Sequence, residues 1–435
     1  MGNRSSSFLT CLGIASIVIA SSLNLCRAQS KERPKLKDFG SSLKRTKWDP
    51  DKQQAVVAKP KSNLTSKDDE DLDVVKIETS LVSSDVLVLD VRGNPVDGLT
   101  ENDFLISEDG AQQKLGMFSL GTNSNVARTI VLIIDYSGSQ APFIETSIAA
   151  AKTMIDKLGP LDRMAIVDDD VEMIQDFTTD KKKLKDKLES LRKLTTRFHA
   201  PRFGDSKQYS ALFATLNEAF DNEDQRPIVI FQTDGDELGY LRNSPLELLE
   251  PFDPRKQEAA RKLLQEHRTR TSFSLEDIYR AAERSRVTIY TVVPGFRIIG
   301  LSQDEQLKQV GADWERMLQS WAMDTHSKVP DSMRQRMYQP GVLEHNRQVS
   351  VLVQTALASV AIASGGWLMF LERPEQADET YSLILSDINR RYLVGYYPTN
   401  KEHDGKRREI AVTIRHHPDY KVVGRKWYYA PGADQ

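Results

Sequence analysis

Cysteine is almost missing from this chain of 435 residues, which contains only Cys11 and Cys26. Both lie near the amino terminus, so nearly the whole chain lacks a disulfide framework, a thiol nucleophile and a thiolate metal site. A protein of this length can fold without disulfides because it can bury a large core. The length favours two or three domains.

An excess of charge of one sign is also lacking, since 59 Lys and Arg residues face 62 Asp and Glu residues, for a net charge of -3. No overall basic field is present to recruit nucleic acid, which we therefore do not expect as a partner. The composition, 39% hydrophobic and 28% charged, is typical of a soluble globular protein.

Long hydrophobic runs are scarce as well. The run at residues 8–25 follows Arg4 and leads into the small-x-small sequence Cys26-Arg27-Ala28. This pattern predicts a signal peptide over residues 1–28, and hence an exported protein in the periplasm, the cell envelope or the extracellular space. A retained membrane anchor is the alternative, and only then do we expect membrane attachment. A span needs about 20 strongly apolar residues, more than this run offers.

Residues 29–73 are polar and lack hydrophobic periodicity, which predicts a disordered tether. Residues 74–122 then alternate apolar and polar positions, as β-strands do, and residues 392–435 repeat that pattern. Neither β segment has enough strands to cover an apolar face alone. We therefore predict that the two segments pair in a split β-sandwich.

Between these flanks, residues 126–391 alternate strand patterns with helix patterns. The apolar run at 129–135 is continuous and β-branched, like a strand that is buried on both faces of a parallel sheet. The alternation predicts a doubly wound α/β domain with a mostly parallel sheet. Residues 236–275 and 297–346 exceed ordinary loop lengths, so we expect them to be insertions near the carboxyl edge of the sheet, where they can shape a partner site.

Polar side chains follow two of the predicted strands at the point where each strand ends. The sequence Asp135-Tyr136-Ser137-Gly138-Ser139 follows the first strand, and Thr233-Asp234-Gly235 follows a later one. Ligands of open α/β sheets bind at this edge, and carboxylate and hydroxyl oxygens suit Mg²⁺, Mn²⁺ or Ca²⁺. A plainer interpretation is that these side chains cap the following helix, which explains one of them but not all three together.

These residues resemble the metal-ion-dependent adhesion site of the von Willebrand factor A (integrin I-like) family. Asp135, Ser137 and Ser139 match its Asp-x-Ser-x-Ser element, and Asp234 matches an Asp that acts through a bound water. Ser210 stands where the family has a Thr, without the Gly that commonly precedes it. The resemblance implies a doubly wound fold and a Mg²⁺ ion (or Mn²⁺ or Ca²⁺) whose coordination an Asp or Glu of a protein partner completes.

The flanks extend the resemblance to a narrower group. The segments GNPVDGLTENDFLISEDG, YLVGYYP and GRKWYYAP are similar to those of the exported von Willebrand A-related proteins known chiefly from acidobacteria. Most of those proteins are uncharacterised, so this likeness implies a fold and a metal site but no biological role.

Catalytic patterns are missing at the candidate residues. Neither a P-loop nor His-Glu-x-x-His occurs, and the candidate serines lie outside any Gly-x-Ser-x-Gly. Adjacent His416 and His417 lie on a predicted strand, so they face opposite sides and cannot bind one metal together. We therefore expect a binding or adhesion protein that is not an enzyme and has no small-molecule cofactor. Two alternatives stay open: an exported hydrolase with its site in the insertions, and a metal-free structural module of the envelope.

Overall fold

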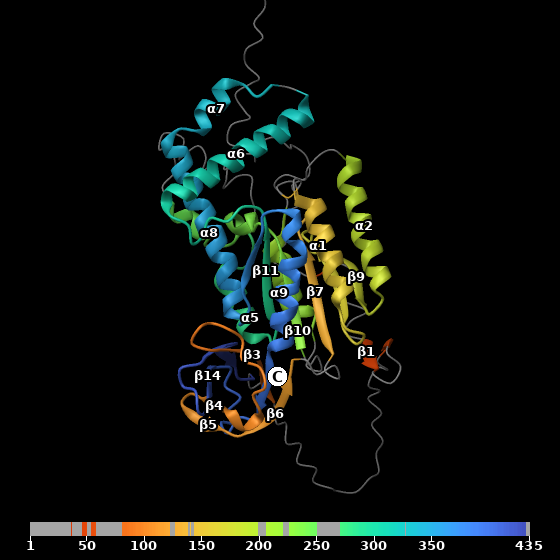
Figure 1. The fold of residues 1–435 in the computed structure, drawn as a ribbon, viewed down its shortest axis with the longest axis vertical. Helices are drawn as coiled ribbons and strands as arrows, with labels where there is room; N and C mark the ends of the chain where they lie inside the picture. The colour runs from red at the N-terminus through yellow and green to blue at the C-terminus, as the bar shows by residue number, and fades with distance from the viewer. Residues whose placement is uncertain are drawn as a thin grey trace, which may run out of the picture.

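The structure is a computed structural model (Figure 1). The residues that it describes are 36, 46–49, 54–57, 81–121, 127–137, 140, 143–198, 206–220, 226–249, 270–326 and 328–431. The predicted signal peptide, residues 74–80 of the first β segment, and the candidate ligand Ser139 lie outside the described residues. Within the described part of the chain, no helix is both long and apolar enough to cross a membrane.

The centre of the molecule is a six-stranded sheet, as the sequence predicts. From one edge to the other, its strands are β12 (Leu368–Leu371), β11 (Thr288–Pro294), β10 (Arg226–Gln232), β7 (Arg128–Ile134), β8 (Arg163–Asp168) and β9 (Met173–Thr178). All neighbouring pairs are parallel except β8 and β9, which are antiparallel. The prediction of a doubly wound, mostly parallel sheet is confirmed, while the edge strand β9 was not expected.

Helices cover both faces of this sheet, which explains its continuous apolar strands. One face packs against α1 (Ile144–Lys157), α2 (Lys181–Phe198) and α9 (Ala377–Arg390), and the other against α3 (Gln208–Glu218), α5 (Leu275–Arg284) and α8 (Pro340–Ala363). In β7, Ile130 and Leu132 point to the first face while Val131 and Ile133 point to the second. Side chains alternate along a strand, so a strand buried on both faces must be apolar throughout.

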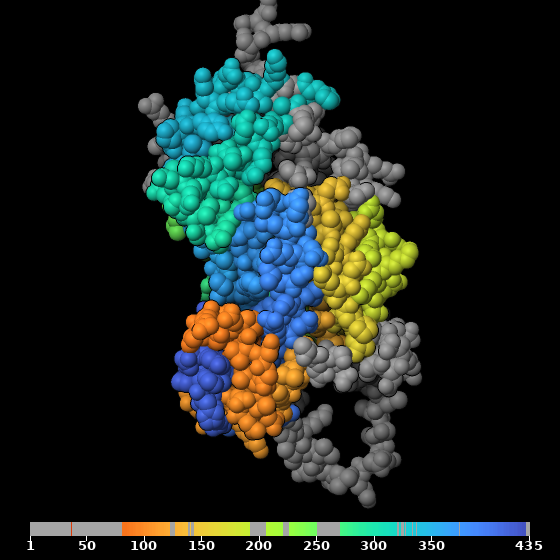
Figure 2. Space-filling model, in the orientation of Figure 1, coloured from red at the N-terminus to blue at the C-terminus, as the bar shows by residue number. Residues whose placement is uncertain are grey.

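The predicted insertions contribute additional helices. Helices α6 (Gln303–Thr325) and α7 (Asp331–Met337) fall within 297–346, and α8 begins at Pro340, before that insertion was expected to end. The described part of 236–275 forms the short 3-10 helices η4 (Asp236–Tyr240) and η5 (Pro245–Leu248), followed by the start of α5. Helices α6 and α7 form one end of the molecule (Figures 1 and 2).

The opposite end is a small β-sandwich made from both flanks of the chain (Figures 1 and 2). One sheet has the order β15 (Lys421–Val423), β3 (Val82–Leu89), β13 (Tyr392–Tyr396) and β6 (Leu115–Leu120); the other has β16 (Trp427–Tyr429), β14 (Arg407–Ile414), β4 (Phe104–Glu108) and β5 (Ala111–Gln113). Strand β13 pairs with β3 and β6, and β14 pairs with β4. The predicted pairing of the two flanks is therefore confirmed.

Two short parts of the segment predicted as a disordered tether have defined structure. Strands β1 (Thr46–Asp49) and β2 (Gln54–Val57) form an antiparallel hairpin. Leu36 is buried in the core between the central sheet and helices α3, α5 and α8, and its backbone N–H donates to Glu218 on α3. A segment without hydrophobic periodicity can thus still supply single apolar residues to a core built by others.

Buried charges connect the sandwich to the amino edge of the central sheet. Arg226, the first residue of β10, pairs with Asp85 of β3 at 3.0 Å, and their side chains are 2% and 7% exposed. Nearby, Arg391 pairs with Asp387 at 2.8 Å and donates to the backbone oxygen of Asp85. These contacts place the sandwich at the edge where β7 and β10 begin, opposite the edge where they end.

Candidate functional site

The candidate site lies where the direction of strand winding changes. Among the six strands of this sheet, β7 comes first in the sequence, yet it lies in the middle of the sheet between β8 and β10. The later strands are therefore added on both sides of it. In open α/β sheets ligands bind beyond the carboxyl ends of the strands at this switch point. Asp135 directly follows β7, and Asp234 lies in the loop after β10. The sheet topology therefore brings these two predicted site residues to the same edge.

Asp135 is held by neutral hydrogen-bond donors. It is 1% exposed, and its Oδ1 accepts from the backbone N–H of Ser137 at 3.0 Å. Its Oδ2 accepts from the Thr233 hydroxyl and from the Gln208 amide, each at 2.9 Å. The three donors come from the loops after β7 and β10 and from the start of α3, so the Asp135 carboxylate is where these three segments meet.

The loop after β10 requires the glycine that follows Asp234. Gly235 has φ 76, a backbone conformation that favours glycine, and a Cβ there would lie 3.0 Å from Leu357 of α8. The Asp234 Oδ2 accepts from the Gln140 amide at 2.6 Å, which connects this loop to the one after β7. The Gln140 Oε1 is buried and has no hydrogen-bond partner among the described residues. An oxygen in that position fits a cation or a water as its partner.

Ser210, the predicted substitute for the family's Thr, faces a carboxylate. Its hydroxyl donates to Glu237 Oε1 at 2.6 Å, and its backbone N–H donates to Oε2 at 2.9 Å. Ser210 and Glu237 are 4% and 2% exposed, respectively. A hydroxyl that donates its proton keeps its oxygen lone pairs, so this geometry leaves Ser210 able to act as a cation ligand.

Gln208 and Glu237 belong to the site although the sequence patterns did not single them out. Gln208 is fully buried; its Nε2 donates to both Asp135 Oδ2 and Asp236 Oδ1, and its Oε1 accepts from the Glu237 backbone N–H at 3.1 Å. Glu237 ends the acidic run Asp234-Gly235-Asp236-Glu237, which was the available signal for it. Gln208 has no such signal, because its role depends on where α3 begins relative to the sheet.

Two acids at this edge, Asp236 and Glu237, have raised pKa values. Desolvation raises the pKa of Asp236 well above its usual range, and the carboxylates of Asp234 and Asp135 add to the rise. Much of Asp236 is solvent exposed, so the repulsion from its neighbours is the firmer of these causes. Burial raises the pKa of Glu237 to about 7, despite the two hydrogen bonds from Ser210. Removing the Glu237 carboxylate from water without a cation is unfavourable.

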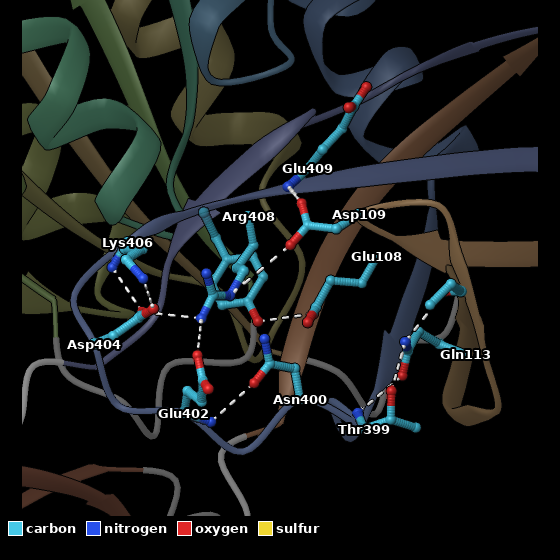
Figure 3. A network of polar contacts seen from close by, with 12 residues as sticks. Glu108, Asp109, Gln113, Thr399, Asn400, Glu402, Asp404, Lys406, Arg408 and Glu409 are labelled. Atoms are coloured by element: carbon cyan, nitrogen blue, oxygen red, sulfur yellow. Dashed lines mark hydrogen bonds and ion pairs between the residues drawn. The ribbon is translucent and has the colours of Figure 1, made fainter.

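A second group of acids in the sandwich has the opposite environment. Figure 3 shows Arg408 between Asp404, Glu402 and Asp109, with nitrogen–oxygen distances of 2.9, 4.0 and 3.9 Å. A guanidinium thus neutralises acids there. At the carboxyl edge, by contrast, the described partners of Asp135, Asp236 and Glu237 are an amide, hydroxyls and backbone N–H groups. These acids receive hydrogen bonds and form no ion pair among the described residues, although the charge of Lys207 lowers the pKa of Glu237.

The donor set at this edge fits a hard cation in its chemistry. No group of three or more His, Cys, Asp or Glu side chains among the described residues is arranged to hold a metal ion. The predicted site needs only two carboxylates, Asp135 and Asp234, because the remaining ligands are hydroxyls. Ser137 is buried beside Asp135, and Ser139 lies outside the described residues. The structure therefore brings Asp135, Ser137, Ser210 and Asp234 to one edge of the sheet.

Acids after β8 border the same edge but have a structural role. The Asp168 Oδ1 accepts from the backbone N–H groups of Asp170 and Glu172, each at 2.9 Å, which closes the turn into β9. Tyr136 donates its hydroxyl to Asp168 and its backbone N–H to Asp169. Desolvation raises the pKa of Asp168 to about 6. The acids at residues 168–170 therefore form a turn at the end of β8.

No protein-family model matches the chain, and no curated protein matches it. Several solved structures do. The von Willebrand factor domain of the type V pili tip protein Mfa5 from Porphyromonas gingivalis has 15% identity and a TM-score of 0.33, over 61% of this chain and 95% of that one. A von Willebrand factor type A protein from Catenulispora acidiphila has 10% identity and a TM-score of 0.31, over 82% and 74%.

A third solved structure is the manganese-loaded TRAP protein of Plasmodium vivax, with 13% identity and a TM-score of 0.28, over 74% of this chain and 97% of that one. Likenesses this distant assign no metal, partner or process to this chain. The narrower resemblance to exported acidobacterial proteins stays a prediction from sequence.

Proposed function

We propose that this chain is an exported adhesion or binding protein that engages a protein partner through a divalent cation at the carboxyl edge of its sheet. Asp135, Ser137, Ser139 and Ser210 hold the cation in this proposal, and Asp234 supports it through a water. A carboxylate from an Asp or Glu of the partner completes the coordination. We propose binding rather than catalysis, with no nucleic acid and no small-molecule cofactor involved.

One observation carries this proposal. Asp135, Asp236 and Glu237 at the switch point of the sheet form no ion pair among the described residues and accept hydrogen bonds from neutral groups, whereas Asp85 and Asp387 at the opposite edge pair with arginines. The charge of Lys207 lowers the pKa of Glu237 without an ion pair between the two side chains. Crowded carboxylates without a counter-ion are unfavourable, and an external cation supplies the missing charge. A bound Mg²⁺ would act there as a Lewis acid toward an incoming carboxylate.

The choice of cation follows from the ligand types. Carboxylate and hydroxyl oxygens favour Mg²⁺, Mn²⁺ or Ca²⁺ over softer metals. Hydroxyl ligands are neutral, so the bound cation keeps enough positive charge to attract an outside anion. Mg²⁺ is our first choice, because it tolerates a site that combines few protein ligands with waters.

Calorimetric titration of the purified chain with Mg²⁺ and Mn²⁺, alongside Asp135→Ala, tests the proposal. We expect binding by the wild type and its loss in the variant, with circular dichroism confirming that the variant folds. Binding that survives in Asp135→Ala would place the cation elsewhere. If neither the wild type nor the folded Asp135→Ala variant binds Mg²⁺ or Mn²⁺, the proposed cation site is rejected. A metal-free envelope module would then be favoured.

The hydrolase alternative has a separate test. Helices α6 and α7 and the η4–η5 segment supply the described parts of the two insertions. Peptidase, glycosidase and phosphatase substrates incubated with the purified chain should remain intact. Turnover that persists in Asp135→Ala would assign the chain a catalytic site outside the carboxyl-edge cluster and would overturn the binding-only proposal.

A further inference from the structure

Gln208 occupies the point between two carboxylates of the candidate site. Its side chain is fully buried, and its single Nε2 donates one hydrogen to Asp135 Oδ2 at 2.9 Å and the other to Asp236 Oδ1. The orientation of the amide follows from its third contact, because Oε1 accepts from the backbone N–H of Glu237 at 3.1 Å. All the hydrogen-bonding capacity of the NH₂ group is thus directed at the two acids.

An amide in this position substitutes in part for a cation. Its two N–H bonds carry partial positive charge, and both point at carboxylates that would otherwise repel each other. The amide has no net charge, however, so it cannot neutralise them.

We propose that Gln208 is the residue that sets the cation affinity of this site, by bridging Asp135 and Asp236 in the metal-free protein and competing with the cation for Asp135. The inference rests on the proposed function. A cation that binds Asp135 through Oδ2 competes with the Gln208 amide for that oxygen, and an amide that is displaced from it loses its bridge to Asp236. The wild-type site should therefore bind the cation more weakly than the same site without the amide.

Gln140 offers a matched control within the same site. It is also a buried glutamine, but its Nε2 donates to one carboxylate only, Asp234 Oδ2, at 2.6 Å. Its Oε1 is buried without a hydrogen-bond partner among the described residues. Gln140 therefore offers the site an oxygen, whereas Gln208 occupies an oxygen of Asp135. Removing the Gln140 amide frees no bridge between two acids, and we expect no gain in cation affinity.

The experiment compares Gln208→Met and Gln140→Met in the full chain. Methionine keeps nearly the same shape and length while it removes both N–H donors. We expect Gln208→Met to bind Mn²⁺ and Mg²⁺ at least about tenfold more tightly by calorimetry, since a tenfold change corresponds to ~1.4 kcal/mol, the order of one hydrogen bond to a charged group. Gln140→Met should bind no more tightly than the wild type. Gln208→Ala is the second variant if Gln208→Met fails to fold.

Thermal unfolding provides a second readout of the same competition. In chelator, Gln208→Met should melt at a lower temperature than the wild type, because the two acids lose their bridge. Saturating Mn²⁺ should raise its melting temperature by more than it raises that of the wild type, since a ligand stabilises in proportion to the logarithm of its concentration over Kd.

The outcomes separate the inference from the function on which it rests. Equal affinities of wild type and Gln208→Met would overturn the role of Gln208 and leave the cation site standing. An equal gain in Gln140→Met would also overturn it, because loss of any amide would then suffice. If neither the wild type nor the Gln208 variants bind a cation, both the inference and the proposed function fail.

Discussion

Buried acids have different partners at the amino and the carboxyl edge of the central sheet. At the amino edge, Asp85 pairs with Arg226 and Asp387 pairs with Arg391, and these four side chains are 2% to 7% exposed. At the carboxyl edge, Asp135 lies among an amide, a hydroxyl and a backbone N–H. A buried acid that pairs with an arginine of the same chain already has its counter-ion, and its role is structural. A buried acid that has neutral donors and lies at the edge where ligands of such sheets bind can accept a charge from outside.

The largest effect should come from the amino edge. Arg226→Met leaves Asp85 buried without its counter-ion and also removes donors to the backbone oxygens of Gly121 and Ile388. We expect the free energy of unfolding to fall by about 3–5 kcal/mol, measured by urea denaturation. The double variant Arg226→Met/Asp85→Leu should recover part of that loss. A decrease below ~1 kcal/mol would mean that the pair is solvated, and the contrast between the edges would fail.

The pH dependence of stability should be controlled by the carboxyl edge. Burial raises the pKa of Glu237 from 4.5 to about 7, so the folded protein holds a proton that the unfolded chain releases. In chelator, the stability that this proton provides is present below pH 4.5 and is lost as the pH rises to about 7. The slope is at most about 1.4 kcal/mol per pH unit.

Glu237→Gln should remove this contribution, so its unfolding free energy should depend less on pH than that of the wild type over the same range. Urea denaturation at several pH values, with chelator throughout, measures the difference. Identical slopes for the two proteins would show that the hydrogen bonds from Ser210 keep Glu237 ionised in the folded state.

Neutralising an acid should have opposite signs at different places in the molecule. In chelator, Asp236→Asn should stabilise the fold, because it relieves repulsion from Asp135 and Asp234 while its carbonyl can still accept from Gln208. Since Asp236 is partly exposed, we expect a gain of only about 0.5 kcal/mol. Asp404→Asn in the sandwich removes a partner of Arg408 and should lower the melting temperature. A loss of stability in Asp236→Asn would contradict the repulsion that we infer.

The smallest effect should come from an ion pair in solvent. Lys182 and Asp186 on α2 lie 2.8 Å apart, but their side chains are 86% and 65% exposed. Water and salt screen such a pair, so Lys182→Met should leave the melting temperature unchanged within error. A clear decrease would mean that pairing by itself, rather than burial, distinguishes the amino edge of the sheet.

Much of the fold could be predicted from local patterns. The apolar run predicted at 129–135 is β7 to within one residue at each end, and the alternating flanks pair as the sandwich. Strand β9 was missed because its sequence, MIQDFT, is short and only partly apolar, as befits an edge strand. The structured residues near Leu36 and in β1 and β2 were missed because their polar segment has no period to detect.

Only the part of the candidate site that follows directly from strand ends could be predicted from the sequence. Asp135 and Asp234 follow buried strands, so their position at the carboxyl edge could be inferred without knowing any contact. Gln208, which lies 73 residues from Asp135 in sequence, could not be inferred, since nothing in its own segment marks it. Its place depends on how α3 starts beside the end of β7. The orientation of Ser210 toward Glu237 depends on the same packing.

The sequence by itself determined the class of the fold, the strands of the buried sheet, and the oxygen-bearing side chains that follow them, because periodicity and strand ends are local properties of a chain. The tertiary structure decided which acids receive arginines and which receive only amides and hydroxyls. Those partners come from segments far apart, such as Arg226 and Asp85, which are 141 residues apart. Burial makes this difference energetically important, because an acid without a counter-ion is costly in free energy only where water cannot solvate it.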